Sequence, residues 1–140
     1  AALLCYDLRF AEAVRILLLR GVHLLCVPTT WTDQGKPQPW DDRGWCGANY
    51  LAAGHAYGNR MWVACADRAG QDGRVRTLGC SAVFAPTGYA AVGPAPPDAE
   101  AILVADCDLR AVEEMRQAAG ADLVADRRPE LYGELVGQRR

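Results

Sequence analysis

The sequence has very little lysine, and its basic residues do not gather into one patch. Lys36 is the single lysine among 15 basic residues, the others are arginines spread along the chain, and the formal net charge is −2. Proteins that bind nucleic acid or anionic membranes usually carry a basic stripe or cluster. We therefore expect neither a nucleic-acid partner nor a membrane partner.

Long hydrophobic runs are also missing. The longest, such as ILLL at 16–19, is far shorter than the roughly 20 apolar residues that span a bilayer. The beginning of the chain lacks the basic and apolar regions of a signal peptide. Apolar residues make up 51% and charged residues 23%, as is typical of a folded globular domain. These features predict a cytoplasmic protein.

The six cysteines, at positions 5, 26, 46, 65, 80 and 107, include no CxxC pair and no spacing typical of a metal site. Most of them lie inside apolar runs, where free cysteine behaves as a small buried residue. We therefore expect reduced thiols, with no bound metal and no cofactor.

Hydrophobic periodicity and turn residues predict a mixed α/β fold. We expect strands at 1–5, 23–28, 61–66, 79–86, 89–93 and 101–108, and helices at 10–20, 47–60 and 109–118. Thr87 and Gly88 form the turn of a hairpin, and Asp108 caps the last helix. Residues 29–46 form a long loop, and loops of this length are usually functional or disordered. Its three tryptophans favour a functional loop. The final residues, 127–140, are expected on the surface or against a partner.

Cys5 lies where a predicted strand passes directly into a turn and a helix. This arrangement is the geometry of a nucleophile elbow, which exposes a side chain at the end of a strand. The N–H groups that open the helix are free to bind an anion, favour a thiolate and hold an oxyanion. The pattern indicates acyl transfer through a thioester, although a buried structural cysteine remains the alternative. Asp7 and Arg9 are expected to anchor the start of the helix.

Five segments in order resemble the second half of the carbon–nitrogen hydrolase (nitrilase) superfamily. They are CYDLRFAEAVRILLLRG, HLLCVPTTW, HAYGNRMWVACADRAG, GCSAVFAPTG and ILVADCDL. The resemblance runs from residue 3 to about residue 132. It implies that residues 1–140 are the C-terminal part of a single domain, a four-layer αββα sandwich truncated at its N-terminal side.

The resemblance also implies a Glu–Lys–Cys catalytic set. Cys5 matches the nucleophile, the backbone N–H of Tyr6 matches an oxyanion-hole donor, and Thr30 and Trp31 fall where the family lines its substrate pocket. The family's Glu and Lys lie upstream of the cysteine and nothing here matches them, because Lys36 follows the nucleophile. Ala11 replaces a usual proline, and His55 and Gly58 stand where the family carries charged residues.

These observations predict a hydrolase of a small amide, carbamoyl compound or nitrile, of which this chain is an incomplete and by itself inactive piece. A Cys–His enzyme using His23 or His55 is a rival reading. A catalytically inactive subunit or small-molecule binding module that keeps the fold is another. The resemblance further implies a homodimer through the helices at 10–20 and 47–60. The identity of the substrate cannot be read from the sequence, since one fold serves many substrates.

Overall fold

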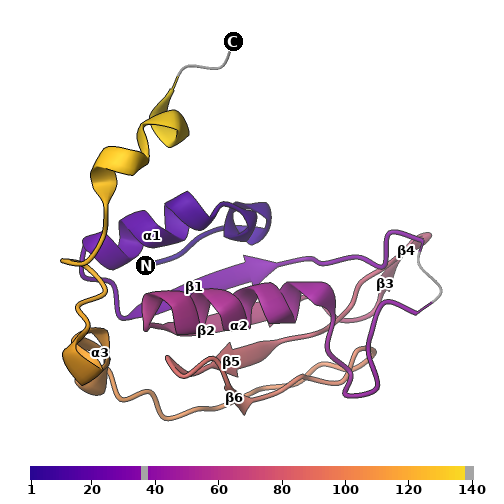
Figure 1. Cartoon of the computed structure of the whole chain (residues 1–140). Helices are drawn as coiled ribbons and strands as arrows, with labels where there is room; N and C mark the ends of the chain where they lie inside the picture. Colours follow the sequence, from indigo (N-terminus) through magenta and orange to yellow (C-terminus); the bar gives the residue numbers. More distant parts are fainter. Residues whose placement is uncertain (36–37, 138–140) are drawn as a thin grey trace.

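A four-stranded mixed sheet forms the centre of the computed structural model, which describes residues 1–35 and 38–137 (Figure 1). The strand order is β1-β2-β5-β6, with β1 and β2 parallel and the other two pairs antiparallel. The strands are β1 Leu24–Thr29, β2 Trp62–Asp67, β5 Ala82–Phe84 and β6 Ala90–Val92. The pair β5–β6 is the predicted hairpin, and Gly88 closes its turn by donating its N–H to the carbonyl of Ala85.

Two helices cover one face of this sheet. They are α1, Ala11–Leu19, and α2, Gly47–Asn59, close to the predicted bounds. A short 3₁₀ helix, η1, occupies Cys5–Arg9 before α1. The core between helices and sheet contains the buried side chains Leu8, Val14, Leu18, Leu25, Val27, Ala52, Ala56, Met61, Val63, Cys65, Ala82 and Phe84. Burying each large member contributes about 1.5–3 kcal/mol, so this core holds the layers together.

The opposite face of the sheet is less well covered. Along β1, Leu25, Val27 and Thr29 are buried, whereas the alternate residues Cys26 and Pro28 are exposed. This alternation is expected of a strand with one packed face. The chain therefore supplies one helical layer and one sheet layer of the αββα arrangement, in agreement with the predicted fold class.

Two predicted strands are not formed as such. Residues 1–5 contribute one isolated bridge, between Ala2 and Cys26, because the chain turns away from the sheet at Cys5. Residues 101–108 are extended but pair with no strand in the described part of the chain. A strand is completed only by hydrogen bonds to a neighbour, and Ile102 and Val104 are 92% and 79% exposed. The apolar pattern of residues 101–108 is thus typical of a strand, but no described strand lies beside it to complete the pairing.

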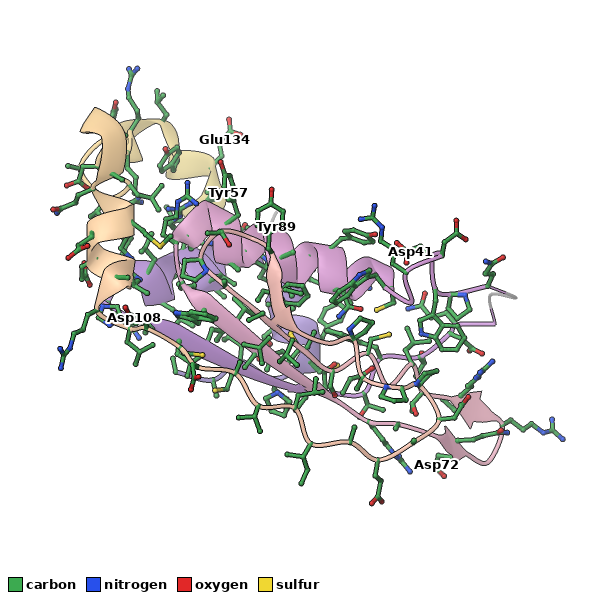
Figure 2. All side chains as sticks on the ribbon, turned by 90° about the horizontal axis from the view of Figure 1, so that it is seen from below. Asp41, Tyr57, Asp72, Tyr89, Asp108 and Glu134 are labelled. Carbon is green, nitrogen blue, oxygen red and sulfur yellow. The ribbon has the colours of Figure 1, made fainter. Side chains whose placement is uncertain are left out.

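The remaining elements are short. The strands β3, Gln71–Asp72, and β4, Val75–Arg76, form a small hairpin, and α3 spans Ala111–Arg116. Asp108 lies just before α3 (Figure 2) and its Oδ1 accepts the N–H groups of Arg110 and Ala111, as predicted. The 3₁₀ helices η2, Ala118–Gly120, η3, Pro129–Leu131, and η4, Gly133–Val136, complete the chain. No helix within the described ranges is long and apolar enough to cross a bilayer.

Candidate active site

Cys5 occupies the turn between the extended first residues and α1. The N–H of Leu3 donates to Cys26 and that of Cys26 to Ala1, so the chain runs beside β1 until it reaches this turn. The backbone of Cys5 has φ +42°, a left-handed conformation that few residues other than glycine adopt. Strain of this kind costs about 1–3 kcal/mol and clusters at functional sites. The thiol is half-buried instead of packed in the core.

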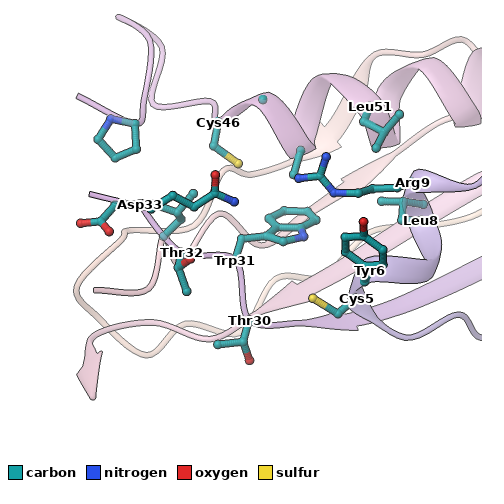
Figure 3. Close-up of a pocket in the computed structure, with 15 residues that line it drawn as sticks. Cys5, Tyr6, Leu8, Arg9, Thr30, Trp31, Thr32, Asp33, Cys46 and Leu51 are labelled. Atoms are coloured by element: carbon teal, nitrogen blue, oxygen red, sulfur yellow. The ribbon is translucent and has the colours of Figure 1, made fainter. Parts of the chain in front are cut away.

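A pocket of about 470 Å³ opens beside this turn. Its wall is made of η1, the residues that follow β1, and the start of α2, and it includes Cys5, Tyr6, Thr30 and Trp31 (Figure 3). In Figure 3 the sulfur of Cys5 points toward the side on which Thr30 and Trp31 lie. The four residues predicted from the sequence are thus brought together in one cavity.

The backbone N–H of Tyr6 is available to a ligand. It belongs to the first turn of η1, where N–H groups have no partner inside the helix. No described residue accepts a hydrogen bond from it, whereas the next N–H, of Asp7, donates to Leu4. A free N–H next to a thiol is a suitable donor for an oxyanion.

Asp7 and Arg9 have different places in the structure. Asp7 Oδ2 accepts the N–H of Leu4 at 3.1 Å, which fixes the turn as predicted. Arg9 was also expected to have a structural role, but its side chain lines the pocket and lies 5.5 Å from the centre of the Tyr6 ring. Arg9 is therefore a pocket residue that the sequence reasoning missed.

Neither histidine is placed to act on Cys5. His55 Nε2 lies 2.8 Å from the carbonyl oxygen of Leu8, and this buried contact ties α2 to η1. His23 Nε2 lies 2.5 Å from Glu113 of α3. Both rings are committed to other partners, so the structure does not support a Cys–His pair.

A second cysteine, Cys46, also lines the pocket, at the start of α2. A hydrogen bond with the Cys80 side chain lowers the pKa of Cys46 to about 7 and raises the pKa of Cys80. Cys46 is only 2% exposed, however, and its N–H and sulfur are both within hydrogen-bond distance of Asn49 Oδ1. Cys46 therefore lines the pocket wall but exposes much less of its surface than Cys5, which is half-buried.

Asp67, at the end of β2, holds one wall of the pocket. Its Oδ1 accepts the N–H of Trp31 at 2.8 Å and its Oδ2 accepts that of Cys80 at 3.0 Å. Burial raises the pKa of Asp67 to about 6, and these N–H donors only partly oppose the rise. The carboxylate of Asp67 thus joins the segments that contain Trp31 and Cys80, two contacts that the sequence did not predict.

We expect the Asp67→Asn substitution to change how stability depends on pH. The folded-state pKa lies above the usual 3.8, so between about pH 4 and pH 6 the native state binds more protons than the unfolded chain. The contribution of this group to stability therefore falls as pH rises through that window. The amide that replaces the carboxyl group does not titrate. In Asp67→Asn the free energy of unfolding, measured with urea at several pH values, should therefore fall less between about pH 4 and pH 6 than in the wild type. Asp72→Asn, at an exposed aspartate paired with Arg68, is the control and should show the same fall in stability with pH as the wild type. An unchanged pH dependence of stability in Asp67→Asn would contradict the expectation.

Comparisons with known proteins identify the family of this chain. The family model of carbon–nitrogen hydrolases matches residues 1–117. An N-carbamoylputrescine amidase of Arabidopsis thaliana is 32% identical over 142 residues, covering 95% of this chain and 46% of the relative. The chain thus spans less than half the length of this curated relative.

Solved structures show the same fold. A carbon–nitrogen hydrolase from Helicobacter pylori G27 superposes with a TM-score of 0.78 at 23% identity, covering 99% of this chain and 49% of that one. A mutant amidase from Nesterenkonia sp. AN1 is 28% identical and superposes with a TM-score of 0.66. The match covers 94% of this chain and 41% of the amidase chain. That amidase carries the acetamide moiety of fluoroacetamide covalently added at its active-site cysteine. From the family match and the shared fold, the chain belongs to the carbon–nitrogen hydrolase family.

Proposed function

We propose that the protein containing this chain hydrolyses a non-peptide C–N bond in a small amide, carbamoyl compound or nitrile, through a thioester on Cys5. The observation that carries the proposal is the strained turn that holds the Cys5 thiol at the pocket beside the unpartnered Tyr6 N–H. The similar N-carbamoylputrescine amidase and the Nesterenkonia amidase with its modified cysteine support it.

For an amide, the Cys5 sulfur forms a bond to the carbonyl carbon and the carbonyl π pair moves to oxygen. The Tyr6 N–H stabilises the resulting oxyanion. When the carbonyl reforms, the C–N bond breaks and the nitrogen leaves with a proton as ammonia or an amine. Water then attacks the thioester, the C–S bond breaks, and the acid and the free thiol are released.

The proposed reaction also requires a general base and further stabilisation of the oxyanion. The family resemblance assigns these roles to a glutamate and a lysine. The described residues that line the pocket include neither, and Lys36 lies outside the described residues. We propose that both groups come from parts of the protein not contained in these 140 residues, and we expect the chain alone to be inactive.

The pocket favours a small polar substrate. Arg9 and Asp33 place a positive and a negative side chain on its wall, and Thr30 and Thr32 add hydroxyl groups. A ligand pocket of a few hundred Å³ with a few polar groups is typical of small-molecule sites. This composition is suited to a substrate that carries a charged or hydrogen-bonding group besides its scissile amide.

The test is to capture the thioester. The full-length protein is incubated with a panel of small amides, carbamoyl compounds and nitriles, quenched in acid, and mapped by mass spectrometry. We expect an acyl group on the peptide that contains Cys5, and hydroxylamine should divert it to a hydroxamic acid. An acyl group on the Cys46 peptide instead, or hydrolysis with no covalent species, would contradict the assignment of Cys5.

A catalytically inactive binding subunit is the second candidate, because no glutamate or lysine is found among the described pocket residues. It predicts that panel compounds bind to the full-length protein without turnover and without acylation of Cys5. Calorimetry, run on the same panel, separates binding from hydrolysis.

We also propose self-association through α1 and α2, as expected from the sequence. Ile16 and Leu19 of α1 are 48% and 40% exposed, and Tyr50 and Tyr57 of α2 are 55% and 57% exposed. Figure 2 shows Tyr57 projecting from the end of α2 near Tyr89 of the hairpin turn. Light scattering on the full-length protein tests the proposal, and a monomer at tens of micromolar would refute it.

A further inference from the structure

The register of the sheet places a threonine level with Cys5. Ala2 pairs in parallel with Cys26, and parallel neighbours advance together residue by residue. Three residues further along, Cys5 comes level with Thr29, the last residue of β1. The Thr29 Oγ1 lies 3.1 Å from the Cys5 Sγ and donates a hydrogen bond to it.

Thr29 is held more firmly than the cysteine it contacts. Its side chain is only 8% exposed, its carbonyl accepts the N–H of Arg68, and its strand pairs with β2 along its whole length. A β-branched side chain has few rotamers, so a buried threonine on a paired strand presents its hydroxyl in a fixed direction. Cys5, in contrast, is half-buried on a strained turn.

We propose that Thr29 is a positioning residue for the nucleophile, an inference that rests on the proposed function of Cys5. Its hydroxyl donates to the sulfur and thereby selects the thiol orientation that faces the pocket. Hydrogen bonds to an ionised acceptor are shorter and stronger than neutral ones, so the contact strengthens as the thiolate forms. Thr29 contacts the sulfur from within the protein, whereas the neighbouring Thr30 lines the pocket itself.

The experiment compares Thr29→Val, which keeps the shape and removes the hydroxyl, with Thr29→Ser, which keeps the hydroxyl. Iodoacetamide labelling of Cys5 in the full-length protein is timed by mass spectrometry, and kcat and KM are measured on whichever panel amide is hydrolysed. We expect Thr29→Val to slow labelling and lower kcat by about 10-fold each, with KM changed less than about 3-fold. Thr29→Ser should restore most of both rates.

Thr77→Val is the matched control, because Thr77 is also buried and its hydroxyl donates elsewhere, to the Gly70 carbonyl. It should leave the labelling rate of Cys5 unchanged. The comparison then distinguishes the loss of any buried hydroxyl from the loss of the Thr29–Cys5 hydrogen bond. If Thr29→Val does not fold, Thr29→Ala serves as the variant without the hydroxyl. Labelling of Thr29→Val within 2-fold of the wild-type rate would overturn the inference.

The two proposals fail separately in this design. If no amide is hydrolysed but Thr29→Val still slows labelling of Cys5, the positioning role stands and the proposed function falls. If amides are hydrolysed through Cys5 and Thr29→Val is labelled and turns over at the wild-type rates, the proposed function stands and Thr29 has no positioning role.

Discussion

Replacing Cys5 by alanine should lower kcat of the full-length protein by about 10⁴-fold or more, because it removes the thiol that we propose as the nucleophile. No described neighbour can replace it: Cys46 is the other thiol on the pocket wall, and it is almost fully buried beside Asn49. Turnover of a panel amide, measured at saturating substrate, gives the effect directly.

The matched control for this change is Cys26→Ala. Cys26 is an exposed cysteine of β1, on the face of the sheet away from α1 and α2. Its removal should leave turnover within about 2-fold, since an exposed side chain away from special contacts contributes little. Residual activity of Cys5→Ala within 10-fold of wild type would assign the chemistry to another group and end the thioester proposal.

Gly79→Ala should be among the most destabilising single substitutions in this chain. Gly79 has φ +62°, and an added Cβ would stand 2.6 Å from the carbonyl oxygen and 2.8 Å from the Cα of Pro97. Backbone atoms cannot rotate away as a side chain can, so the segment before β5 must move. We expect a loss of about 3 kcal/mol or more in the free energy of unfolding, which is large for one residue.

Gly73→Ala separates the two causes of that loss, which are the left-handed backbone angle and the contact with Pro97. Gly73 has nearly the same backbone angle, φ +57°, but nothing lies within 4 Å of its added Cβ. It should cost only about 1–2 kcal/mol, the usual penalty of a left-handed alanine. Urea unfolding of both variants measures the difference, and equal losses would show that contact with Pro97 contributes nothing.

The same glycine is linked to the candidate active site. The next residue, Cys80, donates its N–H to Asp67, which also accepts the N–H of Trp31. A shift of the chain at Gly79 therefore reaches the pocket wall through Asp67. We expect Gly79→Ala to change substrate affinity as well as stability.

Much of this protein was determined by the sequence alone. The sequence predicted helices at 10–20, from its apolar periodicity, and at 47–60, and these are α1 and α2. The apolar runs at 23–28 and 61–66 predicted the strands β1 and β2, whereas their parallel pairing is seen only in the structure. The step from strand to helix at Cys5 predicted the turn, because local pattern and chain direction suffice to place a residue at a strand end. The family resemblance then predicted that Tyr6, Thr30 and Trp31 lie in the same site as Cys5.

Tertiary structure decided what depends on contacts between distant segments. Residues 101–108 have a strand pattern but no described strand beside them, so their hydrogen bonds go unmade within the described chain. Arg9 and Cys46 turned out to line the pocket, and Asp67 to bind two loops, because side-chain partners are fixed by packing and not by spacing. Thr29 reaches the sulfur of Cys5 only because the parallel register brings residues 24 apart in sequence to the same level of the sheet.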